Sequence, residues 1–152
     1  MLFLVLKFVH VLAAILAIGF NAAYGLILGR ARRGGADGRE MAFALKTVKF
    51  MDDRVANPCY VLLGVTGVTM VLLQGYPWSY RWIHASLALL VVIAVLGLAV
   101  YTPTLRRQIE ILETRGASDP EFARLSTRGA ILGGILGVLV LVIVALMVYK
   151  PS

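Results

Sequence analysis

Two histidines lie within strongly apolar stretches of this sequence, and each follows a basic residue by three positions. His10 follows Lys7, and His84 follows Arg81. An ionisable side chain in a membrane-type apolar segment is a candidate functional group, because leaving it unpaired in hydrocarbon is costly. Neutral imidazole ligates heme iron, and the two cations could hold the propionates. The spacing therefore predicts a b-type heme with His10 and His84 as axial ligands, serving electron transfer or heme-linked oxidation.

Two other interpretations use the same residues. Copper could be bound by His10 and His84 with Met70 as a soft ligand. Alternatively, His84 is a wetted boundary residue, His10 hydrogen-bonds a tyrosine or a carbonyl, and the basic residues snorkel to the headgroups. The protein would then be a non-catalytic membrane subunit or scaffold that docks a partner or anionic lipid. No catalytic residue is identified, and the absence of acids from the apolar spans argues against hydrolysis.

The composition indicates an integral membrane protein. Of 152 residues, 60% are apolar and 15% are charged, and the mean hydropathy is +0.86. A soluble domain of this size cannot bury so much apolar surface, so soluble, disordered and nucleic-acid-binding classes are excluded. The single Cys59 permits no internal disulfide.

Four stretches approach or exceed the length of about 20 residues that crosses a bilayer, namely 2–28, 55–73, 82–101 and 130–149. They predict an all-α membrane four-helix bundle forming a single transmembrane domain, with both termini on one side. Twelve of the fifteen basic residues fall in the segments 30–54 and 103–128. By the positive-inside rule these are cytoplasmic loops and the termini lie outside the cytoplasmic (inner) membrane. The net charge of +7 is therefore explained by the orientation of the protein in the membrane.

Local patterns refine the loops. Apolar residues recur at helical spacing over 41–51 and again over 105–112, which predicts short amphipathic helices, the first lying at the membrane surface. Ser118 and Glu121 form a capping-box pattern that starts the last helix. Pro58 lies near the start of the second span, where a missing backbone donor costs little. Asn21 and Asn57 are expected to join the first two helices by a hydrogen bond or to line a proton path.

The first and third spans open on similar residues. Residues 7–15 and 81–89 match position by position as basic, aromatic, β-branched and histidine, ending in alanine and an aliphatic residue. This repeat predicts two helical hairpins related by a pseudo-twofold axis. A homodimer is a separate expectation that does not depend on the repeat. It also predicts that His10 and His84 lie within about 3 Å of the same membrane depth.

Three motifs carry a family resemblance: the opening Leu6-Lys7-Phe8-Val9-His10, then Trp82-Ile83-His84, and the closing Val148-Tyr149-Lys150-Pro151. They resemble a family of predicted integral membrane proteins of unknown function, the HemJ-type membrane protoporphyrinogen oxidases, and the membrane part of CopD-type copper-resistance proteins. The resemblance implies a bundle of four or slightly more helices and a b-type heme on His10. It also implies oxidoreductase activity on protoporphyrinogen, but Ser86 stands where the oxidases carry a lysine, which weakens that expectation.

Overall fold

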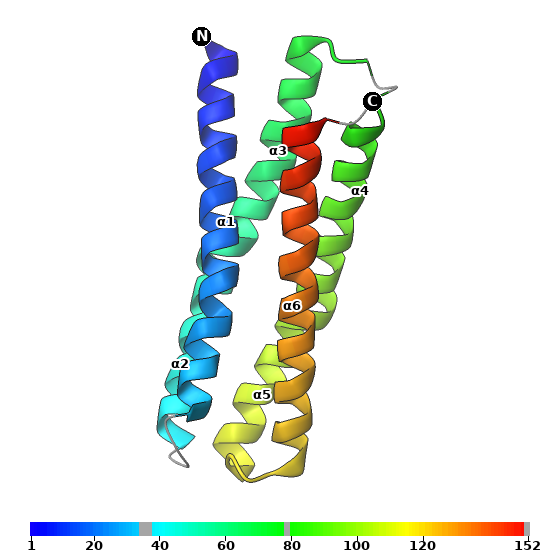
Figure 1. Cartoon of the computed structure of the whole chain (residues 1–152). Coiled ribbons are helices and arrows are strands. Elements are labelled where there is room, and N and C mark those ends of the chain that lie inside the picture. The colour runs from blue at the N-terminus through cyan, green and yellow to red at the C-terminus, as the bar shows by residue number, and fades with distance from the viewer. Residues whose placement is uncertain (34–37, 78–79, 151–152) are drawn as a thin grey trace.

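The computed structural model describes residues 1–33, 38–77 and 80–150, and this part of the chain is helical without strands. Four long helices confirm the predicted all-α bundle (Figure 1). The first is α1 (Leu2–Arg33) and the last is α6 (Pro120–Tyr149). The second consists of α2 (Gly38–Met51), the π-helical segment η1 (Asp52–Ala56) and α3 (Asn57–Gln74). The third consists of α4 (Arg81–Val95), the π-helical segment η2 (Leu96–Tyr101) and α5 (Thr102–Arg115).

The four helices pair as two hairpins. α1 packs most extensively against α3 and also against α2, and α6 packs against α4 and α5. Contact between the hairpins is strongest at one end, where α2 meets α5, and sparse between α3 and α4. The start of α1 and the end of α6 lie at the same end of the bundle (Figure 1).

The helices are longer than a membrane requires. The two composite helices have 37 and 35 residues, and at 1.5 Å per residue each exceeds about 50 Å. A hydrocarbon core is about 30 Å thick, so roughly 20 Å of each composite helix extends beyond it. The segments expected as loops around a short surface helix instead continue the membrane helices. Their periodic apolar faces explain this difference, because those faces can be buried against one another.

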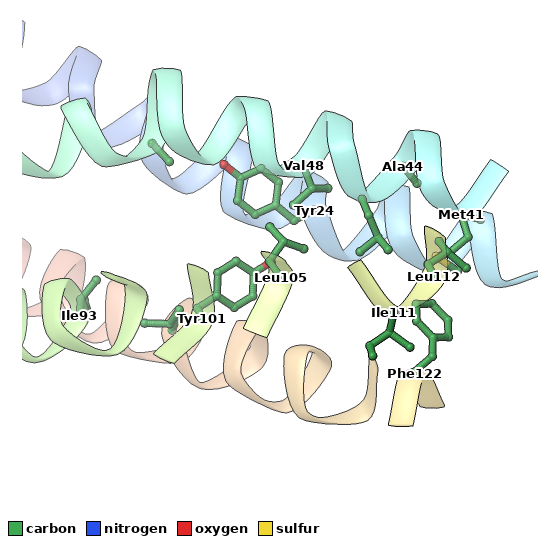
Figure 2. Close-up of a cluster of buried hydrophobic side chains, with 14 of the residues drawn as sticks. Tyr24, Met41, Ala44, Val48, Ile93, Tyr101, Leu105, Ile111, Leu112 and Phe122 are labelled. Carbon is green, nitrogen blue, oxygen red and sulfur yellow. The ribbon is translucent and has the colours of Figure 1, made fainter. Parts of the chain in front are cut away.

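The extended end contains most of the buried core. Met41, Ala44 and Val48 of α2 face residues of α5 and α6, and Figure 2 shows the two groups projecting into the space between the hairpins. Leu105 and Ile111 are each 1% exposed in this core. By contrast, the apolar side chains along the membrane part point largely outward, as a lipid solvent favours.

Ion pairs also stabilise this extended end of the bundle. Lys46 of α2 pairs with Glu113 of α5 at 2.5 Å. The Glu121 carboxylate forms ion pairs with Arg107 (Nη2 to Oε1, 3.2 Å) and Arg115 (Nη1 to Oε2, 2.8 Å), and these pairs join α5 to the start of α6. The cap of α6 is Asp119, whose Oδ1 accepts the Glu121 backbone N–H at 2.7 Å, and this corrects the prediction that Ser118 is the cap.

Prolines account for both π-helical segments. Pro58 follows η1 by two residues and Pro103 follows η2 by two residues. Proline lacks an N–H and its ring clashes with the carbonyl four residues earlier, so a continuous helix must widen there. The widening appears as five-residue backbone bonds, from Asn57 N–H to Asp52 O and from Thr102 N–H to Gly97 O. Pro58 therefore lies at the start of α3, as the sequence predicts, and inside a long helix that continues from α2 through η1.

Candidate functional site

His10 is buried between α1 and α3. Its Nδ1 lies 2.8 Å from Oγ1 of Thr66, and its side chain is 7% exposed. The Thr66 hydroxyl donates its one proton to the Leu62 carbonyl at 2.6 Å, so it accepts from His10 Nδ1–H. Neutral His10 thus carries its lone pair on Nε2. Gly67 makes room for the ring, since a Cβ there would lie 3.3 Å from His10 Cε1.

His84 lies on the other hairpin, near the start of α4, and its side chain is exposed. His10 contacts Thr66 of its own hairpin, and His84 lies on α4 of the other hairpin.

The other predicted site residues are dispersed. Lys7 and Arg81 are exposed, each one turn beyond its histidine. Met70 is half-buried on α3, one turn beyond Thr66. Ser86 is 5% exposed, and its Oγ has no hydrogen-bond partner in the described part of the chain.

A cavity of about 600 Å³ lies between the two hairpins, where α3 and α4 make little contact. Its walls come from all four long helices and include both π-helical segments. Its rim contains Val61 and Val65 of α3 and Val91 and Leu98 of the third helix, all at least 58% exposed. The cavity thus opens through an apolar rim onto the surface that faces lipid.

One end of this cavity is polar. Asp52, which is 7% exposed, accepts a hydrogen bond from Thr102 Oγ1 at 3.0 Å across the hairpins. The Asn57 side chain is also within hydrogen-bonding reach of this carboxyl group. The cavity also has three phenol groups within electrostatic range of Asp52, those of Tyr24, Tyr60 and Tyr101.

Two of these phenol groups have different partners. Tyr60 OH accepts a hydrogen bond from Asn21 Nδ2 at 3.2 Å, so Asn21 joins the first two long helices as predicted, with Tyr60 as its partner. Asn57 instead bonds Asp52 of its own long helix. Tyr24 is 5% exposed, and its hydroxyl has no hydrogen-bond partner among the described residues. Buried hydroxyls are normally satisfied, so an unpartnered hydroxyl on a residue that lines the cavity is unusual.

Sequence reasoning missed Asp52 as a site residue because it lies among charged neighbours that suggest a loop. A signal was present, however. Met41, Leu45 and Val48 are spaced by four and three, and the next position on that face is residue 52. An acid on the apolar face of an amphipathic helix indicates a buried carboxylate. The Asn57-Pro58 and Thr102-Pro103 pairs marked the two widened segments beside it.

Comparison with known proteins gives one match. A family model described as "Predicted integral membrane protein (DUF2269)" matches residues 4–151, nearly the whole chain. This agrees with the predicted resemblance to a family of unknown function. No curated protein and no solved structure matches the chain.

Proposed function

We propose that this chain, a member of the DUF2269 family of predicted integral membrane proteins, binds an amphipathic small molecule from the bilayer in the cavity between its hairpins. The observation that carries the proposal is the cavity itself, with an apolar rim open to lipid and a buried polar end. Cavities of roughly 300–1,000 Å³ with a few placed polar groups are typical of small-molecule sites.

The polar end supports binding rather than packing alone. A chain that used this space only for packing would satisfy its own buried polar groups. Here the Tyr24 hydroxyl has no partner in the described residues, and the hydrogen-bond partners of Asp52, Thr102 and Asn57, are both neutral. A ligand with an apolar body and a hydrogen-bonding head complements both parts of the cavity.

Photolabelling tests this proposal. The protein is reconstituted into lipid nanodiscs and irradiated with trifluoromethyl-iodophenyl-diazirine, an apolar probe that partitions into bilayers. Labelled residues are then mapped by mass spectrometry. We expect labelling at Ala56 and Ile93, which line the cavity although they are 1% and 2% exposed.

Leu105 is the matched control, because it is 1% exposed and does not line the cavity. Labelling of Ala56 and Ile93 at least several-fold above Leu105 supports the proposal. Equal labelling at the three positions would mean that the cavity does not admit a molecule from the bilayer, and the proposal would be abandoned. Ala94→Phe, which fills the cavity from α4, should lower labelling of Ala56.

A b-type heme is the second candidate, and the His10 tautomer favours it. Metal-ligating histidines usually donate one ring N–H to a hydrogen-bond acceptor and ligate through the other nitrogen. The bond from His10 Nδ1–H to Thr66 matches this arrangement and leaves Nε2 for iron. His10 could therefore ligate the iron through Nε2, and His84 on the other hairpin would supply the second ligand. Lys7, one turn from His10, and Arg81, one turn from His84, would hold the propionates. A bound heme would supply one-electron chemistry.

An absorption spectrum tests the heme proposal. Protein purified in mild detergent, oxidised and then reduced with dithionite, should give a Soret band and sharp reduced bands at near one heme per chain. His10→Ala should abolish the band and His84→Ala should shift it. A colourless preparation after heme is supplied during expression would refute this candidate. Copper without porphyrin, lost in His10→Ala, would instead favour the copper alternative with Met70.

A further inference from the structure

We infer that the ligand of the cavity between the hairpins is an organic cation whose charge is held by Asp52. This inference rests on the proposed function and names the chemical class of its ligand. It is carried by the charge balance around Asp52 and by the kind of groups that share the cavity with it.

The charge of Asp52 is only partly offset by the chain, because Lys49 attracts both Asp52 and Asp53 and forms its ion pair with Asp53. The direct partners of Asp52 are the Thr102 hydroxyl at 3.0 Å and the Asn57 amide, both neutral. The neighbouring carboxylate, Asp53, forms an ion pair with Lys49. Among the residues that the structure describes, Asp52 forms no ion pair. Buried charges are normally paired, so this carboxylate lacks the counter-ion that burial favours.

The nearby basic residues are committed elsewhere. Arg107 pairs with Glu110 and Glu121, and Arg54 and Arg106 have exposed side chains. Lys49 is held in its ion pair with Asp53. The cavity, which Asp52 lines, is the route by which a further counter-ion would reach this carboxylate.

The lining favours an organic cation over a metal ion. The described residues contain no group of three His, Cys, Asp or Glu side chains that could hold a metal. Tyr24, Tyr60 and Tyr101 instead bring three aromatic rings to the polar end, and aromatic faces attract cations. The remaining lining is mostly apolar and the volume is about 600 Å³, which suits a cation carrying a hydrophobic body.

Tetraphenylphosphonium is the probe, and tetraphenylborate is its control because the two ions have the same shape and opposite charge. Binding to the full chain in lipid nanodiscs is measured by equilibrium dialysis against empty nanodiscs. We expect saturable tetraphenylphosphonium binding near one per chain and no saturable tetraphenylborate binding.

Two substitutions separate the role of the Asp52 carboxylate from the general electrostatic attraction of the protein for cations. Asp52→Asn removes the charge and keeps the shape and the hydrogen bond with Thr102, and it should weaken tetraphenylphosphonium binding at least about tenfold. Asp53→Asn removes an equal charge from the adjacent residue, whose partner is Lys49, and should change binding less than about threefold. Elution position and helicity establish that both variants are folded.

The outcomes distinguish the inference from the proposed function. Tetraphenylphosphonium binding that is unsaturable, or equal in Asp52→Asn and wild type, would overturn the cation inference, even if the diazirine still labels Ala56 and Ile93. Absence of that labelling would refute the proposed function itself. Equal loss in Asp52→Asn and Asp53→Asn would also overturn the inference, because it would show a field effect without a specific carboxylate.

Discussion

Replacing Tyr24 by phenylalanine should stabilise the protein without ligand. The hydroxyl of Tyr24 is buried, at 5% exposure of the residue, and has no hydrogen-bond partner in the part of the chain that the structure describes. A buried hydroxyl left unsatisfied costs about 1–3 kcal/mol. Removing it recovers part of this cost, so Tyr24→Phe should raise the free energy of unfolding by about 1 kcal/mol.

Tyr60→Phe is the matched comparison and should have the opposite sign. The Tyr60 hydroxyl accepts a hydrogen bond from Asn21 at 3.2 Å, so its removal leaves the Asn21 amide without that partner. The expected loss of stability is about 1 kcal/mol. The two variants delete the same atom type from the same cavity, and of the two hydroxyls only that of Tyr60 has a hydrogen-bond partner among the described residues.

Reversible unfolding in mixed micelles of increasing dodecyl sulfate content measures both variants, with helicity as the signal. The reasoning predicts a higher midpoint for Tyr24→Phe and a lower one for Tyr60→Phe. A destabilisation of Tyr24→Phe equal to that of Tyr60→Phe would refute it, because the Tyr24 hydroxyl would then be serving the fold.

Two further predictions concern the contacts around His10 and Asp52. Gly67→Ala should destabilise the protein by about 1 kcal/mol, because its Cβ would lie 3.3 Å from the His10 ring. Gly19→Ala is the control and should be neutral or stabilising, because no atom lies within 4 Å of its Cβ position. Unfolding midpoints in mixed micelles compare the two variants. Thr102→Val should lower the free energy of unfolding by about 1–3 kcal/mol, because it removes a hydroxyl that donates to the buried carboxylate of Asp52. Adding Asp52→Asn to Thr102→Val should recover part of that loss, and full additivity of the two substitutions would contradict direct coupling.

The fold class was predictable because lipid as a solvent imposes a simple rule. Long apolar stretches must be helical to satisfy their backbone groups, and four such stretches are visible in the sequence. The continuation of the second and third helices was harder to predict. Charged residues such as Lys46 and Lys49 resemble a loop, and they lie on a helix only because Leu45 and Val48 are buried against α5 and its neighbours.

Which residues share a site is harder to predict from the sequence, for a physical reason. Position along the sequence gives an approximate depth for His10 and His84, but which neighbour a helix face meets depends on how the hairpins pack. The packing directs His10 to Thr66 of its own hairpin and separates the facing walls of α3 and α4. The partnership of Asp52 with Thr102, fifty residues away, similarly arises only when the two π-helical segments are brought together.

A structure of the full chain determined in lipid, at a resolution that shows bound molecules, tests the central claim most directly. The account predicts non-protein density in the cavity between α3 and α4, with its polar end within hydrogen-bonding distance of the Tyr24 hydroxyl and the Asp52 carboxylate. Closure of this space by direct packing of α3 against α4, with the Tyr24 hydroxyl bonded to the chain itself, would contradict it.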